Sequence, residues 1–243
     1  FGFLISSFLT KHGLTQLKNL NLFQTIREEG PSNHLSKINT PTTGGIFIIF
    51  PFLILLIITS LLFYSVKILI LFICVSGFFI IGLLDDYLSI KNEQSTGLKS
   101  NQKFLLQSLI SIIFIFLASQ SNYINPLILV SKNLEINTTF MIIPISFFTL
   151  VGLSNSVNLT DGLDGLASGC SAIVFYGLGT EILLKGQEEL IIFSILCYAM
   201  SGLCLGFLKF NKYPAKIFMG DTGSLTIGAV LASISILTNS FFI

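Results

Sequence analysis

Charged residues are scarce in this sequence. Only 10% of its 243 residues are Asp, Glu, Lys or Arg, whereas a typical soluble domain has about 25%. Hydrophobic residues make up 52%, Phe alone occurs 24 times, and the mean hydropathy is +0.85. This composition excludes an ordinary soluble domain and indicates an integral membrane protein. The formal net charge of +1 gives no reason to expect a nucleic-acid partner.

Cysteine and histidine are also sparse. His12 and His34 lie too far apart to suggest a local metal-binding motif. The cysteines fall inside apolar segments without the spacing of metal ligands, so we interpret them as small buried residues rather than disulfides. They are Cys74, Cys170, Cys197 and Cys204. No internal repeat or low-complexity tract is evident, and the 20 glycines suit closely packed transmembrane helices.

Long apolar segments occupy most of the chain, and a helix that spans a bilayer needs roughly 20 apolar residues. The sequence starts at Phe1 without Met and ends in apolar FFI, so we expect a fragment that is incomplete at both ends. Phe1–Leu9 is too short to span by itself. Seven further spans are predicted, at Gly45–Tyr64, Ile68–Leu84, Phe104–Ala118, Thr139–Leu153, Leu166–Leu184, Leu190–Leu208 and Ser224–Leu237. The predicted fold class is all-α: one polytopic transmembrane domain with about eight helices, including a cytoplasmic loop or interfacial helix at residues 11–43.

Basic residues are unequally divided between the two sides of the predicted membrane. Because successive spans alternate in direction, ten Lys and Arg residues fall on one side and three on the other. Cytoplasmic loops carry the excess of Lys and Arg, so the first side is predicted to be cytoplasmic. The larger set is Lys11, Lys18, Arg27, Lys37, Lys91, Lys99, Lys103, Lys209, Lys212 and Lys216, and the smaller is Lys67, Lys132 and Lys185. The aspartates Asp85, Asp86, Asp161, Asp164 and Asp221 lie on the cytoplasmic side, where they can meet at one membrane face.

The segment NLTDGLDGLA, from Asn158 to Ala167, places two carboxylates between apolar segments. A carboxylate at the edge of a lipid-buried helix is costly, so the pair is interpreted first as functional. If Asp161 and Asp164 are helical, their spacing of three puts both on one face, towards one cation or sugar. The alternative is helix capping, because Thr160 and Asp161 are residue types that cap helix N-termini. Capping would explain one of the two aspartates.

Adjacent carboxylates stand in GLLDDYLSIK, near the cytoplasmic end of a predicted span. Asp85 and Asp86 repel each other unless a shared proton or a cation offsets the repulsion. Magnesium would do so, because it is held by one or two carboxylates together with phosphate oxygens. The alternative is a pair of solvated charges at a helix end.

A turn of small residues in IFMGDTGSLTIG leads into the last predicted span. Such a turn presents backbone N–H groups and a positive helix end to a phosphate, with Asp221 available for a metal ion. It is not a Walker P-loop, because no Gly-Lys-Ser or Gly-Lys-Thr follows. Lys37, in SKINTPTTGG, and Lys99 and Lys103, in GLKSNQK, offer positive charge, although a solvated helix start is the simpler interpretation for Lys99. Together the motifs predict a phosphate transfer in which Mg²⁺, lysines and positioning provide most of the stabilisation.

Three of these motifs, in this order, resemble the signatures of the polyprenyl-phosphate N-acetylhexosamine-1-phosphate transferases, also called glycosyltransferase family 4. They are DDY at Asp85–Tyr87, NLTDGLDGLA at Asn158–Ala167 and FMGDTGS at Phe218–Ser224. The loop QTIREEGPSNHLSKINTPTTGG, Gln24–Gly45, resembles the bacterial muramoyl-pentapeptide branch of that family. The resemblance extends over essentially the whole chain.

The resemblance implies an activity and a location. In this branch, phospho-N-acetylmuramoyl-pentapeptide passes from UDP-MurNAc-pentapeptide to undecaprenyl phosphate, giving lipid I and UMP, and Mg²⁺ is required. The family has ten helices, of which about eight would be present here. The implied location is the bacterial cytoplasmic membrane, with the lipid bilayer as a partner and the active site on the cytoplasmic face. The sequence leaves a homodimer open.

The resemblance also implies roles for individual residues. Asp221 would be the principal metal ligand, with Asp161 as a second. Asp85 would act as base or nucleophile towards the lipid phosphate, with Asp86 beside it, and the sequence leaves covalent and direct attack open. The phosphate and sugar region would be lined by Lys37, Lys103, Asn158 and Asp161. The uridine would be held by Gly162, Leu163, Asp164, Asn211 and Phe218, with Phe218 stacked on uracil.

The sequence departs from the family pattern in two places. Ser89 stands where the muramoyl branch usually has a lysine, and Lys91 is a candidate substitute. The chain also stops before the family's histidine-rich cytoplasmic loop, so we expect the fragment alone to be inactive. Two alternatives remain: a sister enzyme that uses UDP-GlcNAc, and a cation-coupled transporter, which would carry acidic residues near mid-helix and inverted repeats.

Overall fold

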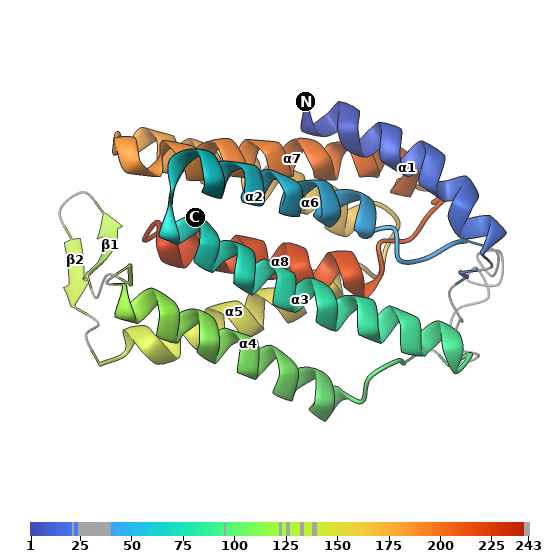
Figure 1. Cartoon of the computed structure of the whole chain (residues 1–243), viewed down its shortest axis with the longest axis horizontal. Coiled ribbons are helices and arrows are strands. Elements are labelled where there is room, and N and C mark those ends of the chain that lie inside the picture. Colours follow the sequence, from blue (N-terminus) through green and yellow to red (C-terminus); the bar gives the residue numbers. More distant parts are fainter. Residues whose placement is uncertain are drawn as a thin grey trace.

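Eight α-helices form the body of the protein in a computed structural model (Figure 1). The structure describes residues 1–20, 22–23, 40–94, 96–121, 123–124, 127–131, 134–137 and 140–240. The helices are α1 Gly2–Asn19, α2 Ile46–Phe63, α3 Val66–Lys91, α4 Ser100–Gln120, α5 Ile142–Thr160, α6 Leu166–Leu184, α7 Ile191–Asn211 and α8 Gly220–Leu237. A short 3-10 helix, η2 Glu188–Leu190, precedes α7. The predicted all-α polytopic class is confirmed.

Seven helices are long and apolar enough to cross a membrane, and they correspond one to one with the predicted spans. They are apolar because a bilayer core offers no hydrogen-bond partners, so each backbone must pair within its own helix. The boundaries differ mainly at the polar ends. Helix α3 continues beyond Leu84 to Lys91, and α5 continues beyond Leu153 to Thr160. Asp85, Asp86 and Asn158 are therefore helical residues rather than loop residues.

The first helix differs from its prediction. Helix α1 continues through the polar residues after Leu9 to Asn19, and it is not among the candidate membrane spans. Its small residues pack closely on α7: a Cβ added at Gly206 would lie 2.9 Å from Cβ of Ser6, and Oγ of Ser7 donates to the Gly206 carbonyl. Small residues permit this approach of two backbones.

An antiparallel hairpin of two strands, β1 Leu127–Ser131 and β2 Leu134–Asn137, joins α4 to α5. Leu127 pairs with Asn137, and an irregularity falls between Leu129 and Ser131. The sequence did not predict this hairpin. Figure 1 places it at the end of the bundle opposite to the start of α8.

Helix α8 is the central element of the bundle. It packs mainly against α3 and α5, and also contacts α2 and α6. Nearly all of its side chains from Thr222 onwards are buried, and many of them are Gly, Ala, Ser or Thr. Oγ of Ser154 on α5 donates to the carbonyl of Leu225 at 3.0 Å, and a Cβ added at Gly228 would lie 2.5 Å from Cα of Ser154. The start of α8 is thereby held between α3 and α5, and α4 packs on both of those helices.

Candidate active site

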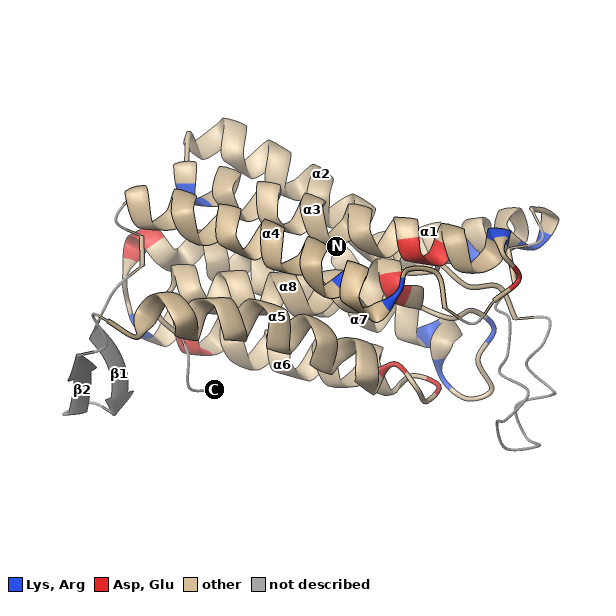
Figure 2. Ribbon diagram, turned by 90° about the horizontal axis from the view of Figure 1, so that it is seen from below, with Lys and Arg blue, Asp and Glu red and all other residues tan. Residues whose placement is uncertain are grey.

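The predicted aspartates gather at one end of the bundle, where α3 and α5 end and α4 and α8 begin. Figure 2 shows most of the Lys and Arg residues towards this same end, where α3 ends. Asp85 and Asp86 come from α3, and Asp221 comes from the first turn of α8. One carboxylate oxygen from each of the three residues lies within 4.8 Å of the other two. The two aspartates of α3 are buried, so the alternative of solvated helix-end charges does not hold.

Asp85 binds groups from the segment that leads into α4. Its Oδ1 accepts a hydrogen bond from the backbone N–H of Leu98 at 2.9 Å and lies 3.0 Å from Nζ of Lys103. The neighbouring Gly97 allows this contact, because a Cβ there would overlap the carbonyl oxygen of Asp85. The chain before α4 must therefore lie directly against the end of α3.

Asp86 caps the N-terminus of α8. Its Oδ1 accepts from the N–H of Asp221 at 2.9 Å, and its Oδ2 accepts from the N–H and hydroxyl of Thr222 at 3.1 and 2.6 Å. The first N–H groups of a helix lack partners within it, and an anion there is stabilised by the helix dipole. Gly220 has φ of +72°, and a Cβ there would overlap Oδ2 of Asp86. Asp86 thus positions the first turn of α8, which carries Asp221.

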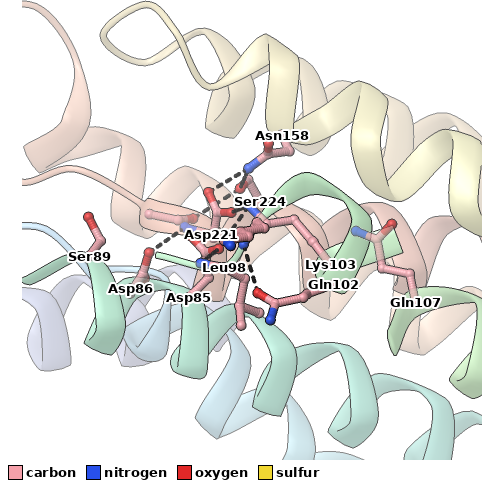
Figure 3. Close-up of polar contacts among 12 residues, drawn as sticks. Asp85, Asp86, Ser89, Leu98, Gln102, Lys103, Gln107, Asn158, Asp221 and Ser224 are labelled. Atoms are coloured by element: carbon pink, nitrogen blue, oxygen red, sulfur yellow. Dashed lines mark hydrogen bonds and ion pairs between the residues drawn. The ribbon is translucent and has the colours of Figure 1, made fainter. Parts of the chain in front are cut away.

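Asp221 is held on both carboxylate oxygens. Its Oδ1 accepts from Nδ2 of Asn158 at 2.7 Å, and its Oδ2 forms an ion pair with Nζ of Lys103 (Figure 3). The amide of Asn158 also donates to Oγ of Ser224 at 2.9 Å. One residue from α4 and one from α5 therefore fix the orientation of a carboxylate on α8.

The donor set fits a divalent cation. Asp85, Asp86 and Asp221 bring three carboxylates together, and the ion pairs found among the described residues supply one ammonium, that of Lys103. Carboxylate oxygens are the ligands that hard cations prefer. Asp85 is better placed than Asp86 to hold such an ion, because its partners among the described residues are on Oδ1, whereas both oxygens of Asp86 accept hydrogen bonds from α8.

Asp161 lies next to this cluster but outside it. It is the C-cap residue that follows α5, and it is not among the three carboxylates that come within 4.8 Å of one another. Burial raises the pKa of the Asp161 carboxyl well above its usual range, and the carboxylates of Asp221 and Asp86 raise it further. A hydrogen bond from the backbone of Gly220 opposes this pKa shift. A second cation-binding role for Asp161 stays a prediction.

Asp161 and Asp164 do not share a helix face, because both lie in the turn between α5 and α6. The capping alternative is also wrong: the residue at the start of α6 is Gly165, with no side-chain cap. Oδ2 of Asp164 instead accepts from the N–H of Ala215 at 3.0 Å. The turn is thereby tied to the segment that connects α7 to α8.

The predicted uridine residues lie around that same connection. Asn211 is buried; its Nδ2 donates to the carbonyl of Ile217 at 2.9 Å and its Oδ1 accepts from Ser168. Phe218 is partly buried, and its backbone is hydrogen-bonded to Pro41 and Gly44. Gly162 and Leu163 are exposed. The substrate roles of these residues stay predictions.

Comparison with known proteins decides the family. Residues 68–239 match the family described as glycosyl transferase family 4, and this stretch contains all three aspartate motifs. The chain belongs to glycosyl transferase family 4. The resemblance drawn from the motifs is confirmed, and so is the prediction that the chain is a transferase rather than a transporter.

Relatives in the family are similar over nearly the whole chain. A phospho-N-acetylmuramoyl-pentapeptide-transferase of Prochlorococcus marinus subsp. pastoris (strain CCMP1986 / NIES-2087 / MED4) is 68% identical over 239 residues, which cover 98% of this chain and 67% of the relative. A protein of the same name from Prochlorococcus marinus strain MIT 9301 is 65% identical over 240 residues, covering 99% and 67%. The chain therefore spans about two thirds of the length of these family members.

Lys103 and Lys37 were both predicted at the site, and the structure describes only Lys103. Lys103 lies in the cluster, paired with Asp85 and Asp221, and its role towards substrate phosphate stays a prediction. Lys37 lies outside the described residues, as does most of the Gln24–Gly45 loop. At the position of the usual family lysine, Oγ of Ser89 donates to the carbonyl of Gln94 at 2.6 Å, and Nζ of Lys91 lies 6.0 Å from the ring centre of Tyr87. A substitute role for Lys91 stays a prediction.

Some residues of the site were not singled out from the sequence. Thr222 and Ser224 belong to the GDTGS turn, so their closeness to Asp221 was a usable signal. The backbone of Leu98 carries no signal, because any residue type can present an N–H. Gln107 sits inside a predicted apolar span, where a polar residue is itself unusual, whereas Asn155 follows the predicted end of its span at Leu153.

Adding Mg²⁺ to metal-free protein is expected to raise its melting temperature by several degrees. The cation would offset repulsion among the three carboxylates, and binding at 100 times the dissociation constant stabilises the folded state by about 2.7 kcal/mol. Thermal unfolding in detergent, with and without EDTA, measures the shift. Asp221→Asn should reduce it, whereas Glu181→Gln should not, because Glu181 pairs with Lys185 instead. An equal shift in Asp221→Asn would contradict this site.

Proposed function

We propose that the protein transfers phospho-N-acetylmuramoyl-pentapeptide from UDP-MurNAc-pentapeptide to undecaprenyl phosphate, giving lipid I and UMP. This is the first membrane step of peptidoglycan synthesis. The observation that carries the proposal is the cluster of Asp85, Asp86 and Asp221 around Lys103 at one end of a membrane bundle. The family and the names of the relatives support the muramoyl donor.

Charge and hydropathy support the proposed location. Seven apolar helices make the protein polytopic, and the site lies at the end that the excess of Lys and Arg marks as cytoplasmic. We place it in the bacterial cytoplasmic membrane, with the site facing the cytoplasm. A nucleotide donor then reaches the site from water, and the lipid phosphate reaches it from the bilayer.

In the proposed reaction, an oxygen of the lipid phosphate attacks the β-phosphorus of the donor. A new P–O bond forms to the lipid phosphate, the P–O bond to UMP breaks, and UMP leaves with the bond electrons. The second pKa of a phosphate monoester is about 6, so the attacking group is largely ionised at neutral pH and needs little from a base. In the proposed reaction the lipid phosphate therefore attacks directly, with Oδ1 of Asp85 bound to the Leu98 N–H and Lys103.

The residues of the chain would then mainly bind and orient. Asp221 and Asp85 would hold Mg²⁺, which supplies charge stabilisation for the transferring phosphoryl group. Lys103, held by both aspartates, would place positive charge beside the phosphates. Asp86 would keep α8 in place through its first turn. Asn158 would orient Asp221, and Asp164 and Asn211 would shape the nucleotide side of the site.

Release of UMP with two donors tests the proposal. Full-length protein in detergent, supplied with undecaprenyl phosphate and Mg²⁺, is expected to release UMP from UDP-MurNAc-pentapeptide and not from UDP-GlcNAc. UMP from UDP-GlcNAc alone would assign the protein to the sister branch. Folded protein that releases UMP from neither donor would refute the proposed activity.

A further inference from the structure

A pair of amide side chains lies between α4 and α5, next to the residues that bind Asp221. Nδ2 of Asn155 donates to Oε1 of Gln107 at 2.8 Å, and Nε2 of Gln107 lies 3.5 Å from Oδ1 of Asn155. Nδ2 of Asn155 also donates to the carbonyl of Val151 at 2.8 Å. Gln107 is 0% exposed although it lies within an apolar membrane span. A buried amide is costly in that setting unless it is hydrogen-bonded.

The two amides share helix faces with residues of the site. Gln107 follows Lys103 by four positions on α4, and Asn155 precedes Asn158 by three positions on α5. Residues three or four apart lie on one face, and four residues advance a helix by about 6 Å. Figure 3 shows Gln107 on α4 beyond Lys103 and away from the aspartates. The pair is therefore placed to act on the site through Lys103 and Asn158.

Register between α4 and α5 matters because both helices bind the same carboxylate. Lys103 pairs with Oδ2 of Asp221, and Asn158 donates to Oδ1. Dispersion contacts between apolar helices are not directional, so they restrict sliding and rotation only weakly. A hydrogen bond between buried amides is directional, and a single buried polar residue fixes helix register in coiled coils. One residue of slip moves a side chain by about 1.5 Å along the axis and turns it to another face.

We propose that Gln107 and Asn155 form a positioning pair that holds α4 and α5 in the register at which Lys103 and Asn158 bind the two oxygens of Asp221. The inference rests on the proposed transferase function, since it assigns the pair an effect on that reaction. It assigns a positioning role to two residues that lie outside the three aspartate motifs. Neither residue is a catalytic residue, because each acts through its neighbour on the same helix.

Replacing the pair with apolar residues tests the proposal. Gln107→Leu combined with Asn155→Leu leaves no unpaired amide in the membrane, so the fold should persist while the directional contact is lost. We expect kcat for UMP release to fall by about tenfold to a hundredfold, the loss typical of a small misplacement at a reacting centre. The half-saturating Mg²⁺ concentration should rise, and the affinity for Mn²⁺ measured by EPR should fall in parallel.

Two further variants separate positioning from packing. The exchange Gln107→Asn with Asn155→Gln keeps one long and one short amide between the helices, and it should restore kcat and Mn²⁺ affinity close to wild type. Ser111→Ala is the matched control: Ser111 is buried on α4, and its hydroxyl donates to the carbonyl of Gln107 within that helix. It should leave kcat unchanged.

The outcomes decide between this inference and its alternatives. A folded double-leucine variant with wild-type kcat and Mn²⁺ affinity would overturn the positioning role and leave the pair as a packing contact. An exchange variant as defective as the double-leucine variant would also overturn it. Wild-type protein that binds Mn²⁺ but releases no UMP would refute the proposed function instead, and the Mn²⁺ affinities of the variants would still test the pair.

Discussion

Asp221→Asn is expected to lower kcat for UMP release by about three orders of magnitude, a loss of the size caused by removing a preorganised electrostatic contact. The substitution removes one of three clustered carboxylate charges while keeping the side-chain shape. It also replaces one of the two carboxylate oxygens with an NH2 group, so that one of the two donors now bound there, Nζ of Lys103 or Nδ2 of Asn158, faces another donor. The cation and the lysine would both lose their principal partner on α8.

Steady-state UMP release over a range of Mg²⁺ concentrations measures this effect. Glu181→Gln is the control, because it removes one carboxylate from a membrane helix at the ion pair with Lys185, outside the cluster. It should retain wild-type turnover. Raising Mg²⁺ should recover little activity in Asp221→Asn, since the missing charge also organises Lys103. A folded Asp221→Asn protein with activity within about tenfold of wild type would remove Asp221 from the centre of the site.

Gly82→Ala is expected to reduce turnover by about a hundredfold or more, because it would displace α3 from the start of α8. A Cβ at Gly82 would overlap the carbonyl oxygen of Asp221 and lie 2.6 Å from Cα of Thr222. Both are backbone atoms, so neither can rotate away. The displacement would break the hydrogen bonds from α8 to Asp86 and separate Asp85 from Asp221.

Gly152→Ala provides a matched control in another membrane helix. Gly152 lies within α5, and a Cβ there would have no atom within 4 Å. Alanine favours a helix over glycine by about 1 kcal/mol, so this variant should be at least as stable as wild type and fully active. Thermal unfolding and UMP release, measured for both Gly82→Ala and Gly152→Ala, distinguish the two variants. Equal activity in both glycine variants would mean that the approach of α3 to α8 does not control the site.

The membrane spans could be predicted because their cause is local in the chain. A bilayer core demands about 20 apolar residues with internally paired backbones, and that requirement can be recognised segment by segment. The predicted spans therefore correspond to seven observed helices. The predicted spans ended too early, before Asp85 and Asn158. A charged or amide side chain suggests a loop when its partners on other helices are unknown.

The chemistry-bearing residues could also be recognised, but their partners could not. Paired aspartates beside apolar spans are too costly to be incidental, so the DD, NLTDGLDG and GDTGS motifs pointed to one polar site. Nothing in the motifs themselves indicates that Asp86 caps α8 while Asp221 binds Lys103 and Asn158. These partners lie 63 to 135 positions apart along the chain.

By itself, the sequence determined that this protein is a bundle of membrane helices with its aspartates at one face, and which family it resembles. Only the tertiary structure decided which carboxylates meet, where Asp161 and Asp164 lie, and that Gln107 pairs with Asn155. The physical reason is that hydrophobicity acts on each segment separately. Hydrogen bonds between helices, and close contacts at glycine, require particular atoms of different helices to meet. Only the packing of the helices determines which atoms do so.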